Sequence, residues 1–328
     1  MQHPQKMKTK PRIVYMGTPL FAVAPLKELL DKGYDVAGVI TAPDKASGRG
    51  LSLTCSDVKN FAISRDIPVL QPISLKDESF LLQLAALNGN LFIVVAFRML
   101  PKVVWSMPEL GTFNLHASLL PDYRGAAPIN WVIINGEKET GVTTFLLDEE
   151  IDTGDILFQQ SCIIEPEDHF GSLHDKLMTI GTDLVIKTVD CLADGNHKPM
   201  LQSGLEAQMG ETHLAPKLTK ETGKISWNNS PEDIHNLIRG LSPHPAAQSV
   251  IGSGDSFFPV KIFKSQFLNE DHDLPYGTIV SDGKKSLKVA CNGGFVDITD
   301  LQLAGKKRLS CKEFLAGFRN ISNYCFQS

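Results

Sequence analysis

Apolar runs of strand length alternate with helical patterns through the first two thirds of the chain. Directly after the apolar run Arg12–Gly17, four apolar residues recur at helical spacing: Ala22, Leu26, Leu29 and Leu30. They predict an amphipathic helix that follows a strand. The predicted strands are 12–17, 34–40, 69–70, 91–97, 111–116 and 141–147, and the predicted helices are 22–30, 57–65, 80–87, 127–134 and 168–192. This order predicts an α/β fold with a Rossmann-like, mostly parallel sheet that binds ligands beyond the carboxyl ends of its strands.

The pattern changes after residue 196. Between 197 and 222 the periodicity disappears, which is typical of a linker. Short strand-like runs then follow at 225–227, 249–251, 260–264, 277–280, 287–289 and 295–303, with helical segments at 231–239 and 312–318. They predict a small antiparallel β-barrel of the OB-like type, and Ser310 with Glu313 predicts a capping box for the second helix. We therefore expect an N-terminal α/β domain over 1–196, a linker over 197–222 and an OB-like C-terminal domain over 223–328.

Composition narrows the class of protein. Of the 328 residues, 42% are apolar and 21% are charged, as in an ordinary soluble protein. The longest apolar run covers residues 91–97, far short of the roughly 20 residues that cross a bilayer. The six cysteines are scattered without a C-x-x-C pair, so we expect reduced thiols, no zinc site and a cytoplasmic location.

The charge is unevenly distributed between the two parts of the chain. The net charge is −5, but residues 217–328 hold 14 Lys and Arg against 11 Asp and Glu. A mildly basic C-terminal part on an acidic body is a weak indication of a polyanionic partner, and random scatter of surface charge explains it equally well.

The densest polar signal lies at the end of the predicted strand 111–116. Because side chains alternate along a strand, Asn114 and His116 share one face. Asp152 comes 36 residues after His116, behind the strand 141–147, and it reaches His116 if the two strands are neighbours. An amide can donate to an oxyanion, an imidazole can move a proton near neutral pH, and a carboxylate can orient the imidazole and favour its charged form.

The pattern also indicates what kind of reaction this trio serves. No Ser or Cys stands where a covalent nucleophile is expected, so we expect direct attack of an external nucleophile on a polarised carbonyl. Arg124 follows in the same segment, and its neighbours leave three roles open: it binds an anion, pairs with Asp122 or packs on Tyr123.

These residues also carry a resemblance to a known family. The run Asn114-x-His116-x-Ser118-Leu119-Leu120-Pro121-x-Tyr123-Arg124-Gly125, followed by Asp152, resembles the formyltransferase superfamily that uses 10-formyltetrahydrofolate. Within it, the chain from about residue 12 to 317 is most similar to the members that formylate methionyl-tRNA, which includes the matches Gly17-Thr18-Pro19 and Asp152-Thr153-Gly154-Asp155.

The resemblance implies a role for each matching residue. Asn114, His116 and Asp152 match the catalytic triad, and Ser118, Leu119, Leu120 and Pro121 match the segment that lines the folate site. Arg49 matches the basic residue of a loop that enters the tRNA acceptor end, and Lys306 and Lys307 lie in a C-terminal domain that touches tRNA in the family. The implied substrates are 10-formyltetrahydrofolate, as formyl donor, and initiator methionyl-tRNA. The resemblance also implies a monomer, and the missing zinc signature leads us to expect no metal.

Other functions remain open at this point. A sugar-nucleotide N-formyltransferase that acts on an amino sugar shares the Asn/His/Asp trio, whereas Gly125-Ala126-Ala127-Pro128 and the loop at Arg49 favour the tRNA enzyme. A formyltetrahydrofolate hydrolase is a weaker alternative, because its usual N-terminal regulatory domain has no room here. A non-enzymatic RNA-binding module is disfavoured by the intact trio. A dinucleotide-dependent oxidoreductase is disfavoured because the segment after the first strand lacks G-x-G-x-x-G.

Overall fold

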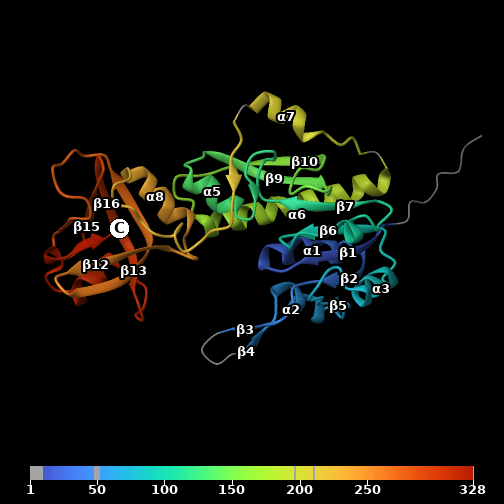
Figure 1. Ribbon diagram of the computed structural model, residues 1–328, viewed down its shortest axis with the longest axis horizontal. Coiled ribbons are helices and arrows are strands. Elements are labelled where there is room, and N and C mark those ends of the chain that lie inside the picture. The colour runs from blue at the N-terminus through green and yellow to red at the C-terminus, as the bar shows by residue number, and fades with distance from the viewer. Residues whose placement is uncertain (1–9, 48–51, 196, 210, 328) are drawn as a thin grey trace, which may run out of the picture. The chain divides into compact units, whose positions relative to one another are not determined.

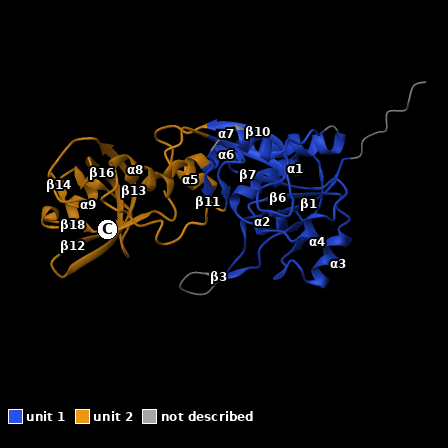
Figure 2. Ribbon diagram, turned by 45° about the horizontal axis from the view of Figure 1, so that its top comes forward, with its two compact units in different colours: residues 1–125, 140–162, 174–214 blue, residues 126–139, 163–173, 215–328 orange. Residues whose placement is uncertain are grey.

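The computed structural model describes residues 10–47, 52–195, 197–209 and 211–327 (Figure 1). The chain forms two compact units (Figure 2). Unit 1 holds residues 1–125, 140–162 and 174–214, and unit 2 holds residues 126–139, 163–173 and 215–328. The functional division at residues 196 and 223 stays a prediction.

A mostly parallel sheet forms the centre of unit 1. Its strands are β1 (Arg12–Gly17), β2 (Asp35–Ile40), β5 (Val69–Leu70), β6 (Leu91–Val95), β7 (Thr112–His116), β9 (Glu139–Leu146) and β10 (Ile156–Ile163). Within the described residues these seven strands have the order β10-β9-β7-β6-β1-β2-β5. The pairs from β7 to β5 are parallel, which confirms the predicted Rossmann-like sheet.

Helices cover the apolar strands of this sheet. Those of unit 1 are α1 (Val23–Asp31), α2 (Asp57–Ile63), α3 (Glu78–Ala86), α4 (Lys102–Trp105), most of α6 (Phe170–Asp194) and α7 (Gln202–Met209), with a 3-10 turn η1 (Leu20–Ala22) before α1. Val14 of β1 and Phe92 of β6 pack in one cluster with Phe80 and Leu84 of α3. Because β1 and β6 are buried on both faces, they read in the sequence as continuous apolar runs.

Several elements of unit 1 differ from the prediction. β9 pairs with β7 in the antiparallel sense. β10 was not predicted, and α7 lies inside the segment predicted to be a linker. A hairpin of β3 (Lys45–Ser47) and β4 (Ser52–Thr54) projects after β2. Hydrophobic periodicity identifies a strand without giving its direction, so the antiparallel edge could not be read from the sequence.

The predicted C-terminal barrel forms unit 2. Its strands are β12 (Ala247–Ser253), β13 (Ser256–Leu268), β14 (Ile279–Ser281), β15 (Leu287–Cys291), β16 (Gly294–Leu303), β17 (Leu309–Ser310) and β18 (Cys325–Gln327). In the described chain the sheet order is β14-β15-β16-β13-β12-β18, with β17 on β16. A bridge between Thr278 and Cys325 joins the two edges, so the antiparallel sheet is nearly closed.

Helices and a short apolar segment complete unit 2. The helices are α5 (Pro128–Ile134), α8 (Pro231–Gly240) and α9 (Cys311–Gly317), with a 3-10 turn η2 (Ile321–Asn323), and the capping box of Ser310 and Glu313 is confirmed. The prediction of a strand at 225–227 was wrong. Ile225 and Trp227 are buried in the barrel core from a turn, where the Trp227 indole donates to Ser249 Oγ.

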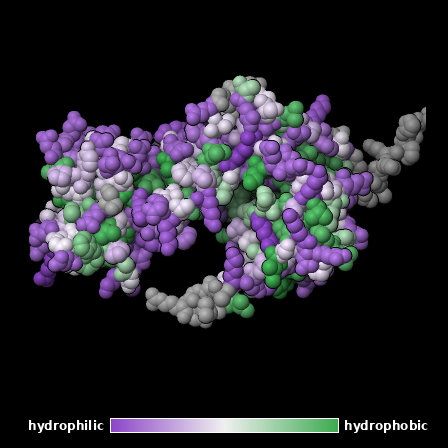
Figure 3. Space-filling view, in the orientation of Figure 1, coloured by the Kyte–Doolittle hydropathy of each residue, from purple (hydrophilic) through white to green (hydrophobic). Residues whose placement is uncertain are grey.

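Among the described residues, no helix has the length and apolar character needed to cross a membrane. Figure 3 shows hydrophilic and hydrophobic residues interspersed on the visible face of each unit.

Candidate active site

Strand β7 places Asn114 and His116 on one face of the sheet of unit 1. The intervening Leu115 points the other way, because its side chain lies against Gly181 of α6. His116 is 6% exposed and Asn114 is half-buried. No hydrogen bond involves the Asn114 carboxamide within the described part of the chain, so this amide is available to a substrate.

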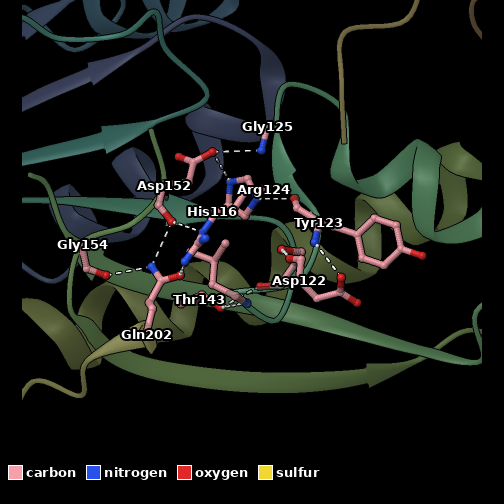
Figure 4. A network of polar contacts seen from close by, with 11 residues as sticks. His116, Asp122, Tyr123, Arg124, Gly125, Thr143, Asp152, Gly154 and Gln202 are labelled. Carbon is pink, nitrogen blue, oxygen red and sulfur yellow. Dashed lines mark hydrogen bonds and ion pairs between the residues drawn. The ribbon is translucent and has the colours of Figure 1, made fainter. Parts of the chain in front are cut away.

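The segment after β7 turns back and fixes the His116 ring. The Ser118 hydroxyl donates to the Asp122 carbonyl at 2.6 Å, and Tyr123 adopts a φ of +57°. The carbonyl oxygen of Tyr123 then lies 3.0 Å from His116 Nε2 (Figure 4). Because a carbonyl only accepts, Nε2 carries the hydrogen, and the neutral ring keeps its lone pair on Nδ1.

Asp152 faces that second nitrogen. Its Oδ2 lies 3.9 Å from His116 Nδ1 and accepts a hydrogen bond of 3.0 Å from the Gly125 backbone N–H. The first distance is that of an ion pair and is too long for a hydrogen bond. The carboxylate therefore acts on the ring through charge, and the Tyr123 carbonyl orients the ring.

The loop 147–155 brings Asp152 to His116. Since β9 runs antiparallel to β7, its carboxyl end lies beside Phe113, at the opposite end of β7 from His116. The loop therefore folds back toward His116, with Gly154 so close to β9 that a Cβ there would lie 1.7 Å from the Leu146 carbonyl oxygen. β7 and β9 are neighbours, as the sequence argument required. However, Asp152 reaches His116 because the loop folds back, and not because the strand ends lie side by side.

Arg124 and Gln202 stabilise this loop through hydrogen bonds to its backbone. Arg124 Nε and Gln202 Nε2 each donate to the Asp152 carbonyl oxygen at 2.9 Å. The structure thus places the Arg124 guanidinium on the Asp152 loop rather than on Asp122 or Tyr123. The sequence analysis missed Gln202, because its segment has no periodicity and no motif to mark it.

The predicted folate-lining segment packs tightly against β9. Ser118, Leu120 and Pro121 are buried, and Leu119 is half-buried against Gly141. Thr143 Oγ1 donates to the Ser118 carbonyl and accepts from the Leu120 N–H. These contacts fix the shape of the segment, and its role toward a ligand stays a prediction.

The predicted RNA-binding residues lie elsewhere. Arg49 is outside the described residues. Lys306 and Lys307 are exposed in the turn between β16 and β17 of unit 2. The described ranges contain no group of three or more His, Cys, Asp or Glu side chains suited to a metal ion.

Two family models match most of the chain. One described as "Formyl transferase" matches residues 11–189, and one described as "Formyl transferase, C-terminal domain" matches residues 217–319. The chain belongs to the formyl transferase family. The resemblance seen in the sequence is thereby confirmed.

Individual relatives give a more specific comparison than the family models. This formyl transferase is 53% identical to a methionyl-tRNA formyltransferase of Bacteroides thetaiotaomicron over 314 residues, which cover 95% of the chain and 97% of that relative. It is 51% identical to a methionyl-tRNA formyltransferase of Flavobacterium johnsoniae, with 94% and 96% covered. A solved N-formyltransferase of Helicobacter canadensis, in complex with folinic acid and dTDP-3-aminofucose, shares the fold. Its TM-score is 0.62 at 21% identity, with 91% of this chain and 100% of that chain covered.

Proposed function

We propose that this formyl transferase moves the formyl group of 10-formyltetrahydrofolate to the α-amine of methionyl-tRNA. The products are N-formylmethionyl-tRNA and tetrahydrofolate. The main support is the approach of Asp152 to His116 on the face of β7 that also carries Asn114. The substrate assignment is supported by relatives with this activity in their names, at about half identity over nearly the whole chain.

The reaction follows from the chemistry of these groups. The α-amine attacks the formyl carbon, and a C–N bond forms while the carbonyl oxygen becomes an oxyanion. The unbonded Asn114 amide donates to that oxygen, an interaction worth about 10²–10³-fold in rate for one donor. The bond between the formyl carbon and the folate N10 then breaks, and the proton lost by the amine ends on N10.

His116 carries the proton between the two nitrogens. Its Nε2–H is bound to the Tyr123 carbonyl, so Nδ1 is the nitrogen that accepts and returns the proton. When Nδ1 is protonated, the carboxylate of Asp152 at 3.9 Å stabilises the imidazolium. A positioned acid–base group of this kind contributes about 10²–10⁴-fold.

The two substrates are assigned to different parts of the chain. A folate donor is supported by the folinic acid bound to the Helicobacter canadensis protein of the same fold, and we assign residues Ser118 to Pro121 to its site. We assign Arg49 to the acceptor end of the tRNA, and Lys306 and Lys307 to phosphates elsewhere on the tRNA. Cationic side chains that neutralise phosphates make RNA binding salt-dependent.

A transfer assay with two acceptors tests the proposal. The purified chain is incubated with 10-formyltetrahydrofolate and either methionyl-tRNA or a dTDP-linked amino sugar, with His116→Ala as the inactive control. Mass spectrometry then detects N-formylmethionine, formylated sugar and tetrahydrofolate. We expect formylation of methionyl-tRNA alone. Formylation of the sugar alone would replace the proposal with a sugar-nucleotide N-formyltransferase, and no transfer to either acceptor would refute it.

A further inference from the structure

Helix α7 contributes a buried side-chain amide that contacts the loop 147–155, which we call the Asp152 loop. Gln202, its first residue, is 3% exposed. Its Nε2 donates to the carbonyl oxygens of Asp152 at 2.9 Å and Gly154 at 2.8 Å (Figure 4). Both hydrogens of the amide are therefore donated to backbone carbonyl oxygens of the loop, two residues apart.

The other end of the Gln202 amide binds Arg124. The Oε1 atom accepts from Arg124 Nη2 at 2.5 Å and from Nε at 3.2 Å, while the same Nε also donates to the Asp152 carbonyl. Gln202 thus bonds both to the loop and to Arg124, which donates to the same Asp152 carbonyl oxygen. An amide suits this position because it donates and accepts at once.

Gln202 is itself held firmly in place. Met200, two residues earlier, forms a two-way backbone bridge with Ile156 at the start of β10. Leu205, one turn further along α7, packs on the buried cluster of Leu120, Phe145 and Ile156. The position of the Gln202 amide is therefore fixed relative to the strands that carry the loop.

Arg124, which lies beside Asp152, is paired with a carboxylate of α7. Arg124 brings a positive charge close to Asp152, and an isolated cation there would compete with the His116 imidazolium for the carboxylate. Glu206 of α7 lies 2.6 Å from Arg124 Nη2 and offsets that charge. Arg124 and Gln202 contact the backbone oxygen of Asp152, whereas its Oδ2 faces Gly125 and His116.

The Asp152 loop needs such support. Asp152 has a φ of +58°, a conformation that a non-glycine residue adopts unfavourably. Its Oδ2 is not hydrogen-bonded to His116, so the charge interaction depends on where the loop backbone is held.

We propose that Gln202 is a positioning residue for formyl transfer, which holds the backbone of the Asp152 loop so that the carboxylate stays opposite Nδ1 of His116. The inference rests on the proposed function, because it concerns the proton step of that reaction. Gln202 does not touch the reacting atoms, and its effect passes through Asp152.

Three variants test this role. Gln202→Met keeps the length and bulk of the side chain and removes all four hydrogen bonds. Gln202→Glu keeps an acceptor for Arg124 and loses both donations to the loop. Ser203→Ala, at the exposed neighbouring position of α7, is the matched control. Circular dichroism and thermal unfolding establish that each variant is folded before kinetics are measured.

Both Gln202 variants should lower kcat by about 10- to 100-fold, the loss that a misplacement of roughly 1 Å can cause, with KM for both substrates within about threefold of wild type. A loss of kcat at nearly unchanged KM is the readout expected when the carboxylate is displaced and substrate binding is kept. Ser203→Ala should behave like wild type.

A double-mutant cycle separates this role from general destabilisation. If Gln202 acts through Asp152, adding Gln202→Met to Asp152→Asn should lower kcat little further, because coupled residues are not additive. Full additivity, or a wild-type kcat in folded Gln202→Met, would overturn the inference while the wild-type enzyme still formylates methionyl-tRNA. Absence of transfer by the wild type itself would instead count against the proposed function.

Discussion

The carbonyl oxygen of Tyr123 lies 3.0 Å from Nε2 of His116 and leaves Nδ1 as the nitrogen that faces Asp152. The contact depends on a backbone group of a residue in the left-handed region. We therefore predict that the neutral His116 ring is the Nε2–H tautomer. Nitrogen-15 correlation spectra of the imidazole, assigned with His116→Gln, measure this directly. The Nδ1–H tautomer would contradict the geometry.

Removal of either polar side chain on β7 should abolish most of the activity. We expect Asn114→Ala and His116→Ala each to lower kcat by at least about 10²-fold, since each removes a donor or a proton carrier from the transition state. Thermal unfolding should show both proteins folded. His197→Ala, which changes an exposed histidine of unit 1, is the control and should keep wild-type kcat. A kcat near wild type for either β7 variant would remove that residue from the mechanism.

Gly154 allows the Asp152 loop to pass close to β9. A Cβ at this position would lie 1.7 Å from the Leu146 carbonyl oxygen, so Gly154→Ala must displace the loop. We expect a loss of kcat of about tenfold or more, because displacement also moves Asp152, together with a lower Tm. Gly204→Ala in α7 meets nothing within 4 Å and should leave kcat unchanged without lowering Tm, because alanine favours a helix over glycine. Equal activity in the two variants would mean that the loop position is unimportant.

The salt dependence of tRNA binding tests the basic turn of unit 2. Replacing Lys306 and Lys307 together by alanine should raise KM for methionyl-tRNA and reduce the slope of log affinity against log salt by about 1–2, the value for one or two lost phosphate contacts. The exposed pair Lys284 and Lys285 gives a control with the same change of net charge. If both double variants respond alike, the effect is one of net charge and the turn has no specific role.

Acid should destabilise unit 2 through His235. Burial and the nearby Arg239 charge lower the pKa of His235 from 6.5 to about 4. Between those pH values the unfolded chain binds a proton that the folded chain does not, so stability falls as pH drops from about 6.5 to about 4. The decrease in Tm from pH 7 to pH 4.5 should be smaller in His235→Gln than in wild type. His244→Gln, at an exposed position of the same unit, should show the full decrease.

The sequence predicted the parts of the site that depend on local spacing. Asn114 and His116 share a face because a strand alternates, and Leu115 packs on α6 as that alternation requires. The barrel strands β12 to β16 and the helix after Ser310 were likewise predictable, because turn residues and a capping box mark them, whereas β17 and β18 were not predicted.

The remaining parts depend on groups that leave no mark in a single sequence. The Tyr123 carbonyl is a backbone atom, and only the turn of residues 118–123 directs it at His116. Gln202 lies at the start of a short helix, and no motif in that segment marks its amide as part of the site. The antiparallel direction of β9 decides how Asp152 arrives, and tertiary packing sets that direction.

The path of the chain through the two units limits how the protein can be divided. It passes between them at 125/126, 139/140, 162/163, 173/174 and 214/215. A fragment that began at residue 217 would lose Asn130 of α5, which donates to the Gly240 carbonyl at 2.8 Å, and Asp168, whose carbonyl accepts from buried Arg239. Grafting the barrel onto another enzyme would therefore require transplanting two distant stretches of upstream sequence with it, so a single contiguous gene segment does not carry this module.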